Sequence, residues 1–400
     1  MARPTAWAPT SRPPRRIAGE ASRPAARSTA LAVHRAALWA ILASDFIAGW
    51  GVQWDIQWHI RIGRDSFWIA PHVITYAGVS GMVLVSFGVV AWDTWRRRGA
   101  HPGADEVTVL GLTSTPGFQL AAWGIALTVL AAPIDDLWHR LFGIDVTLWS
   151  PPHMLGLLGA MVATAACMLV AREVHPPRSA AAMAALIVGG ALLLGKFATA
   201  AQPAFRIAYL HGGVGFHLYA MLGAFMFPLA HLTAVRLTGW RWAPLWVLLV
   251  AVTSGQIGAE IARVGFRVLQ PVSVIEEEIL KDPTSPIAVA HAIAQKNAHP
   301  PGSRSPRFPL ASLLSVLVMI AFDPRGRPTL SVVAYGLALL ATMSWALAGT
   351  PAFAPSVPGI AETLVAVAST IIVALAGGAG ARWLAHLLAG PTPLPSPAPR

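Results

Sequence analysis

Two stretches of the sequence, WDIQWHIRIGRDSFWIAPH at residues 54–72 and IDDLWHRLFGIDVTLWSPPH at residues 134–153, repeat one pattern. Each copy ends one apolar segment and begins the next, so it predicts a helical hairpin with its turn at a membrane surface. The shared positions are Asp55 and Asp135, Trp58 and Trp138, His59 and His139, Gly63 and Gly143, Asp65 and Asp145, and the Pro-His pairs at 71–72 and 152–153.

The composition around these copies is that of a membrane protein. Of the 400 residues, 55% are hydrophobic and 12% are charged, which is about half the charged fraction of a soluble domain. The apolar residues fall in blocks of about 20, the length of a helix that crosses a bilayer. We therefore expect an all-α, polytopic membrane helix bundle with about ten transmembrane helices. The expected spans are 34–54, 69–92, 117–134, 150–171, 180–202, 213–235, 242–264, 308–322, 329–349 and 360–388.

The basic residues orient these spans. The net charge of +11 is carried largely by arginines in the N-terminal tail and in alternate short loops such as Arg96–Arg98. Positive loops stay in the cytoplasm, so both termini are expected there, in a bacterial-type plasma membrane, with the two repeated hairpins at the outer face. The lipid bilayer is the expected partner. No basic stripe interleaves with aromatic residues, which argues against nucleic acid.

The chain is expected to have four parts, the third of which contains a long outer loop at 265–307. A loop of this length is usually functional or disordered, and its stretch 275–296 is interpreted as an amphipathic surface helix that acts as a lid or partner surface. The four parts are a disordered basic cytoplasmic tail at 1–32, a metal-site membrane bundle at 33–240, additional membrane helices at 241–390 and a Pro-rich tail at 391–400.

The repeated hairpins carry the residue types that bind metals. Asp55 and His59 are four residues apart and share one helix face, and His72 opens the following helix. Three such ligands leave coordination positions open, as catalytic metals require. The corresponding residues of the second copy are Asp135, His139 and His153.

Carboxylate and imidazole without thiolate suit copper, zinc, iron or nickel, and affinity peaks at Cu²⁺. The single cysteine, Cys167, excludes an internal disulfide and a thiolate-rich site. The competing interpretation is that these residues are only polar anchors at the membrane boundary. The duplication and the cost of ionisable groups at membrane depth favour metal binding.

Several further polar and aromatic residues receive structural interpretations. Asp65 and Asp145 are expected to cap or brace the hairpins. His211 and His217 in HGGVGFH are six residues apart, so a ligand role would need the glycines to bend the chain. Salt pairing between helices is favoured over a proton or metal path for Asp45, Lys196, Glu260 and Arg263. An interfacial belt is expected from Trp54, Trp58, Trp68, Trp138 and Trp149.

The motif WDIQWH…RDSF…PH resembles the C subunit of the particulate methane and ammonia monooxygenases. That subunit has an Asp, a Trp-His pair, an Arg-Asp pair and a later His at this spacing, and these bind copper within the membrane. The resemblance implies that Asp55, His59 and His72 are copper ligands. The family's next hairpin has Asn-x-x-x-His and a later His as a second copper site, so His139 and His153 match its histidines and Asp135 replaces the Asn.

The resemblance covers about residues 40–160, and this chain departs from the family elsewhere. Asp135 adds a negative charge to the second site, residues 240–400 add spans, and the cupredoxin-like region of the B subunit is missing. The resemblance implies a copper-dependent membrane monooxygenase, or a subunit of one, that oxidises a small apolar substrate with O₂. Other monooxygenase-like subunits or further copies of the chain are the implied partners. The alternative is a non-enzymatic copper-binding, transport or assembly protein.

Overall fold

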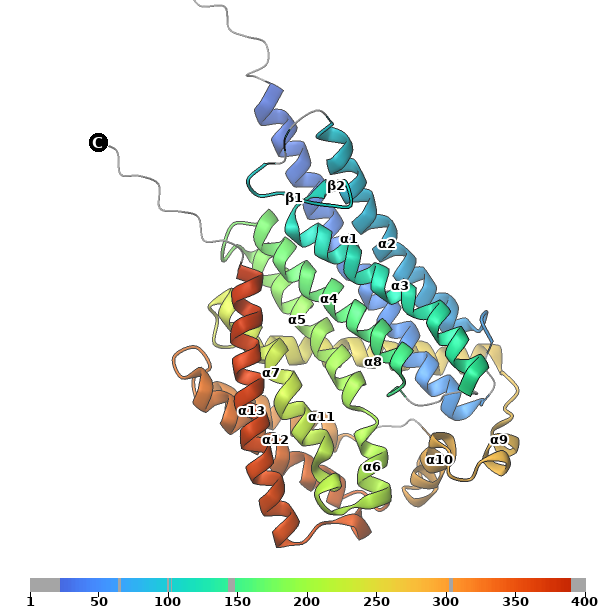
Figure 1. The fold of residues 1–400 in the computed structure, drawn as a ribbon. Helices are drawn as coiled ribbons and strands as arrows, with labels where there is room; N and C mark the ends of the chain where they lie inside the picture. The colour runs from blue at the N-terminus through green and yellow to red at the C-terminus, as the bar shows by residue number, and fades with distance from the viewer. Residues whose placement is uncertain are drawn as a thin grey trace, which may run out of the picture.

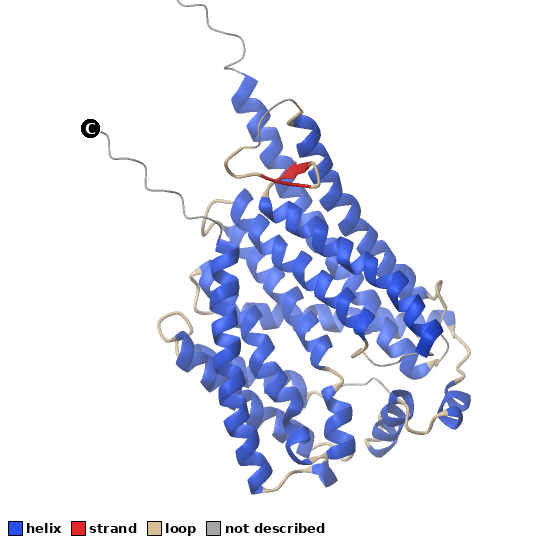
Figure 2. Cartoon of the chain, in the orientation of Figure 1, coloured by secondary structure: helices blue, strands red, loops and turns tan. Residues whose placement is uncertain are grey.

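The computed structural model describes residues 22–63, 66–98, 101, 103–142, 148–301 and 305–389, with the backbone alone for residues 22–27 and 139. Within this part the chain is almost entirely helical, with one small antiparallel hairpin (Figure 2). The strands are β1 (Val107–Val109) and β2 (Leu112–Ser114). The helices are α1 (Ser22–Arg61), α2 (Ala70–Arg96), α3 (Pro116–Phe142), α4 (Pro151–Val174), α5 (Ala180–Ala201), α6 (Ala204–His211), η1 (Gly213–His217), α7 (Leu218–Thr238), α8 (Ala243–Leu269), α9 (Ile275–Lys281), α10 (Pro286–Lys296), α11 (Arg307–Ala321), α12 (Pro328–Ala348), η2 (Ala354–Ser356) and α13 (Ile360–Ala389).

Nine helical stretches of the described residues are long and apolar enough to cross a membrane. This confirms the expected all-α membrane bundle. The expected eighth span at 308–322 corresponds to α11, which has 15 residues and falls short of the roughly 20 that a crossing needs. The nine stretches are Ser28–Arg61, Ala70–Arg96, Pro116–Phe142, Pro151–Val174, Ala180–His211, Gly213–Thr238, Ala243–Leu269, Pro328–Ala348 and Ile360–Ala389.

The first four long helices pack as two hairpins. The helix α1 lies along α2 and α3 lies along α4, while α1 also contacts α4 and α2 contacts α3 (Figure 1). The helix α7 packs against α5, α12 and α13, and α8 joins the two groups through contacts with α1 and α5. The repeated segments therefore form consecutive helical hairpins of one bundle, as their sequence predicts.

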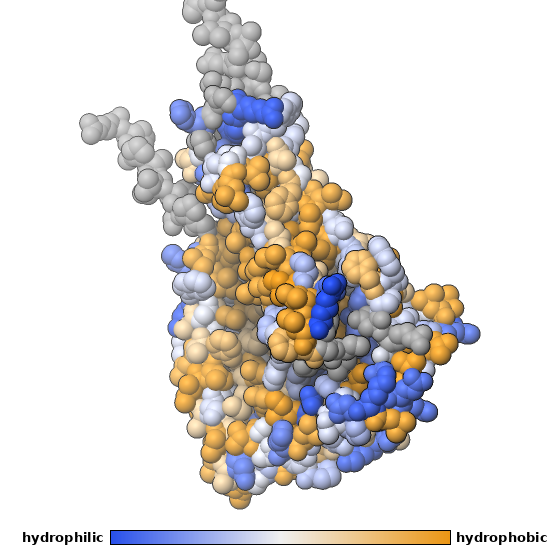
Figure 3. Space-filling view, turned by 45° about the vertical axis from the view of Figure 1, so that its right-hand side comes forward, coloured by the Kyte–Doolittle hydropathy of each residue, from blue (hydrophilic) through white to orange (hydrophobic). Residues whose placement is uncertain are grey.

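Apolar side chains form the core and also cover much of the surface. One cluster includes Leu38, Met82 and Phe118 of the first three helices, and another includes Phe227 and Tyr335 of α7 and α12. Figure 3 shows wide apolar areas on the outside of the bundle, with hydrophilic side chains gathered mainly at its upper end and lower right. A bundle surrounded by lipid tails has this surface, because hydrocarbon solvates exposed apolar residues.

The two repeated hairpins are at the same end of the bundle. The end of α1 and the end of α3 both lie toward the lower right of Figure 1, and the β1–β2 hairpin lies at the opposite end. Helices α9 and α10, which form the segment after α8, lie beside the end of α1 in the same view.

Candidate metal centre

The first repeated hairpin positions three ligand-type side chains. Asp55 and His59 lie on the last two turns of α1, and His72 lies in the first turn of α2. The chain leaves α1 through Gly63, whose φ of +73° is a conformation that glycine adopts without steric cost. Pro71 then fits the first turn of α2, where a missing N–H costs nothing.

Close packing of α1 on α2 brings the ligands of the two helices together. A Cβ atom added at Gly51, one turn before Asp55, would lie 2.5 Å from the backbone nitrogen of Thr75 and 2.9 Å from the carbonyl oxygen of Pro71. Only glycine allows the backbones to approach this closely, as is common between membrane helices.

The two histidine side chains converge on one oxygen of the Asp55 carboxylate. Asp55 Oδ1 lies 3.2 Å from His72 Nε2 and 3.6 Å from His59 Nε2, and one ligand atom from each residue lies within 4.8 Å of the others. Among the described residues, this is the only group of three or more His, Cys, Asp or Glu side chains that meets this geometry. The predicted first site is therefore assembled as a geometric unit.

The environment of these residues fits a bound cation. Asp55 Oδ1 is buried and has no hydrogen-bond partner among the described residues, and a buried polar atom in this state is costly without a further ligand. The side chains of all three residues remain 20–23% exposed. The His59 and His72 rings are 6.5 Å apart, and Tyr76 lies 5.7 Å from the His72 ring.

The tryptophans next to the first site differ from the expected interfacial belt. Trp54 and Trp58 are buried, and both pack against Phe266 of α8. The prediction is wrong for these two residues because α8, which the local pattern cannot place, covers this face of α1. Trp68 and Trp149 are exposed, as a belt requires.

The second repeated hairpin brings together two of its predicted ligands. Asp135 Oδ1 on α3 lies 3.5 Å from His153 Nε2 on α4, and these side chains are 28% and 33% exposed. Asp136, the neighbouring carboxylate, instead forms a 2.7 Å ion pair with Arg140 on the exposed side of α3. The side chain of His139 lies outside the described residues, so the complete second site stays a prediction. Asp65 and Asp145 also lie outside the described residues.

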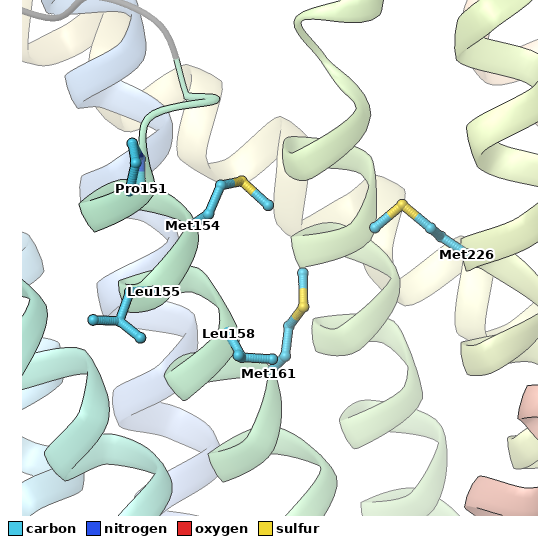
Figure 4. Close-up of a pocket in the computed structure, with 6 residues that line it drawn as sticks. All are labelled: Pro151, Met154, Leu155, Leu158, Met161 and Met226. Atoms are coloured by element: carbon cyan, nitrogen blue, oxygen red, sulfur yellow. The ribbon is translucent and has the colours of Figure 1, made fainter.

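An apolar pocket lies between α4 and α7. It has a volume of about 360 Å³ and is lined by Pro151, Met154, Leu155, Leu158 and Met161 of α4 and by Met226 of α7. Figure 4 shows the three methionine side chains extending into the space between these helices. Flexible thioethers adapt to apolar molecules of different shape.

The other polar residues singled out from the sequence are engaged in structural contacts. Lys196 and Asp45 form a buried ion pair between α5 and α1, and Thr164 of α4 donates a hydrogen bond to the same carboxylate. Glu260 and Arg263 pair within α8 on an exposed face. Salt pairing between helices is thus confirmed for Asp45 and Lys196. The prediction is wrong for Glu260 and Arg263, because these two residues are one turn apart and pair with each other within α8.

His211 and His217 do not form a joint site. His211 is exposed at the end of α6, whereas His217 is buried and its Nδ1 lies 2.9 Å from the hydroxyl of Ser344 on α12. The turn of η1 separates the two side chains.

The long outer loop contains a contact that sequence reasoning missed. It forms two short helices, α9 and α10, in place of the single surface helix expected over 275–296. From α10, His291 Nε2 donates a 2.6 Å hydrogen bond to the carbonyl oxygen of Ile60, the residue after His59. The partners are 231 positions apart, so no local pattern could have predicted their contact.

The resemblance to the monooxygenase C subunit is carried by the motif residues of the two hairpins. Of these, Asp55, His59 and His72 lie together, and so do Asp135 and His153. No protein-family model, curated protein or solved structure matches this chain.

Proposed function

We propose that this chain is a copper-binding membrane protein whose main site consists of Asp55, His59 and His72. The observation that carries the proposal is the convergence of three ligand atoms within 4.8 Å. One of them is a buried carboxylate oxygen that has no hydrogen-bond partner in the part of the chain that the structure describes. A cation would supply the missing partner of Asp55 and would use the two imidazoles at the same time.

Copper is the preferred metal for two reasons. Two imidazoles and one carboxylate without thiolate bind Cu²⁺ more tightly than other divalent first-row metals. The resemblance to the monooxygenase C subunit also points to copper. The same ligands suit Fe²⁺ or Zn²⁺, so direct metal analysis separates these possibilities.

The residues of the chain would hold the metal with open coordination positions. Asp55 contributes one negative charge, and both imidazoles must be neutral to bind. When bound there, copper supplies a redox-active centre at which O₂ can react. The protein supplies the ligands, the close packing of α1 on α2 and the limited exposure to water.

The pocket between α4 and α7 favours oxidation of a small apolar molecule. Its lining consists of Pro, Leu and Met side chains, and pockets of 300–1,000 Å³ are typical of small-molecule sites. Both hairpins are proposed to face the outer side of the membrane, because the arginine-rich loops alternate with them.

Non-enzymatic copper handling is the second candidate. Its supporting observation is that the ligands of the first site are 20–23% exposed, so metal could exchange with a carrier without a large opening of the bundle. The substrate-dependent consumption of O₂ by copper-loaded protein distinguishes the two functions. Consumption with a small apolar substrate supports an oxygenase, and copper binding without consumption supports metal handling.

Metal analysis of the detergent-extracted protein tests the central proposal. We expect copper in the wild-type protein and its loss from the first site in the double variant His59→Ala/His72→Ala. The matched control is His101→Ala/His299→Ala, which removes two exposed histidines and should retain all copper. Unchanged copper content in the first double variant, or iron or zinc in place of copper, would contradict the copper assignment.

A further inference from the structure

The end of α1 is covered by a segment from far along the chain. Three successive carbonyl groups accept hydrogen bonds from the α9–α10 segment, defined as residues 270–297. The bonds are Ile60 O from His291 Nε2 at 2.6 Å, Arg61 O from Ser273 Oγ at 2.8 Å and Ile62 O from the Val274 backbone nitrogen at 2.8 Å. The last carbonyl groups of a helix have no hydrogen-bond donor within the helix. The α9–α10 segment therefore supplies donors to the carbonyl groups at the end of α1.

The covered turn is the one that carries the candidate ligand His59. The first of the three hydrogen-bonded carbonyl groups belongs to Ile60, the residue after His59. Helix ends fray unless other groups hold them, and a frayed turn would let His59 move away from His72, which is fixed on α2. The position of His59 therefore depends on contacts outside its own hairpin.

The α9–α10 segment is itself anchored at other places. Arg206 of α6 donates to the carbonyl of Thr284 at 3.2 Å, and the backbone nitrogen of Ala352 donates to Asn297 Oδ1 at 2.8 Å. Ile275 also packs at Gly63, where an added Cβ would lie 3.1 Å from its Cδ1 atom. The segment thus contacts the end of α1, helix α6 and the turn after α12. These contacts hold the segment in place over the end of α1.

We infer that His291 is a positioning residue for the candidate metal site, acting through its hydrogen bond to the last turn of α1. The inference rests on the proposed function, because it concerns the metal bound by Asp55, His59 and His72. His291 itself is not a ligand through Nε2, since that nitrogen carries the proton donated to Ile60. The residue bonds the backbone next to a ligand, one step further out than the groups that bond a ligand side chain directly and whose loss typically changes metal affinity 10- to 100-fold.

Copper binding by three full-length variants tests this inference. His291→Phe keeps a planar ring and removes the donor, His291→Gln keeps a donor, and His299→Phe changes an exposed histidine two residues after the segment. We expect His291→Phe to weaken Cu²⁺ binding by up to about 10-fold, the lower end of the effect of direct ligand partners, and to alter its electron paramagnetic resonance spectrum. His291→Gln should recover part of the loss, and His299→Phe should match the wild type.

Hydrogen exchange in the metal-free proteins provides a readout that does not depend on copper. We expect faster exchange of the amides at residues 56–62 in His291→Phe, and no change in His299→Phe. If His291→Phe does not fold, Ser273→Ala removes a single bond to the same turn and should change exchange and affinity in the same direction by less.

The possible failures are distinguishable. Wild-type affinity and spectrum in His291→Phe would overturn the positioning role and leave copper binding intact. Absence of any copper in the wild-type protein would overturn the proposed function and, with it, the role of His291 at a metal. Unchanged exchange at residues 56–62 would show that the segment does not hold the turn.

Discussion

Lys196 Nζ lies 2.6 Å from Asp45 Oδ1 and joins α5 to α1 inside the bundle. The side chains are 13% and 3% exposed, and Thr164 contributes a second hydrogen bond to the carboxylate. Removing one member of such a pair leaves a buried charge without compensation, whereas replacing both members with neutral residues does not.

We therefore expect Lys196→Met to destabilise the protein by about 3 kcal/mol and the double variant Asp45→Asn/Lys196→Met to recover most of the loss. Thermal unfolding in detergent, followed by circular dichroism, measures both. The control is Arg263→Met, which breaks an exposed pair within α8 and should change stability little. A double variant as unstable as the single one would contradict this account of the pair.

A comparison of two glycines of α1 tests the close approach of α1 and α2. A Cβ at Gly51 would lie 2.5 Å from the Thr75 nitrogen, whereas one at Gly49 would meet nothing within 4 Å. Gly51→Ala should therefore destabilise the protein by about 1–3 kcal/mol through overpacking and weaken copper binding, because Asp55 and His72 would separate. Gly49→Ala should stabilise α1 by up to about 1 kcal/mol. Unfolding and metal titration of the two variants check both statements, and equal effects would argue against the contact.

The sidedness of the hairpins is testable with cysteines placed in exposed loops. Ser66→Cys lies in the first repeated hairpin, and Asp105→Cys lies in the loop after α2 that carries Arg96–Arg98 near its start. An impermeant thiol reagent added to intact cells should label the first cysteine and not the second. The native Cys167 is buried and serves as an internal negative control. Labelling of position 105 alone would reverse the proposed orientation.

Filling the apolar pocket between α4 and α7 tests access of an apolar substrate. Leu158→Trp places a large ring in the lining of the pocket, so it should slow O₂ consumption with an apolar substrate and leave copper content unchanged. The control is Leu364→Trp on α13, which is exposed elsewhere on the surface. Equal rates in the two variants would show that the pocket is not on the route of the substrate.

Much of the fold follows from short-range patterns. The apolar blocks predict the long helices, and the i, i+4 spacing of Asp55 and His59 places both on one face of α1, where His72 meets them across the hairpin. The apolar block at 308–322 shows where this pattern fails as a predictor of membrane spans. It forms the helix α11, which is shorter than a membrane crossing.

Other features depend on contacts between distant parts of the chain. The burial of Trp54 and Trp58 is caused by Phe266, and the cover of the last turn of α1 comes from residues 273–291. No periodicity in the sequence encodes these partners. The β1–β2 hairpin was also not expected, since each of its strands has only three residues.

The cover over the end of α1 has a consequence for the order of events during synthesis. Asp55, His59 and His72 are all synthesised before residue 73 is added, but Ser273 and His291 follow more than 200 residues later. The first seven long helices must be made before the last turn of α1 acquires its partners. A growing chain therefore contains all three side chains well before the segment that covers the end of α1 exists, and metal delivered at that stage would meet a looser arrangement of these side chains than the finished protein offers.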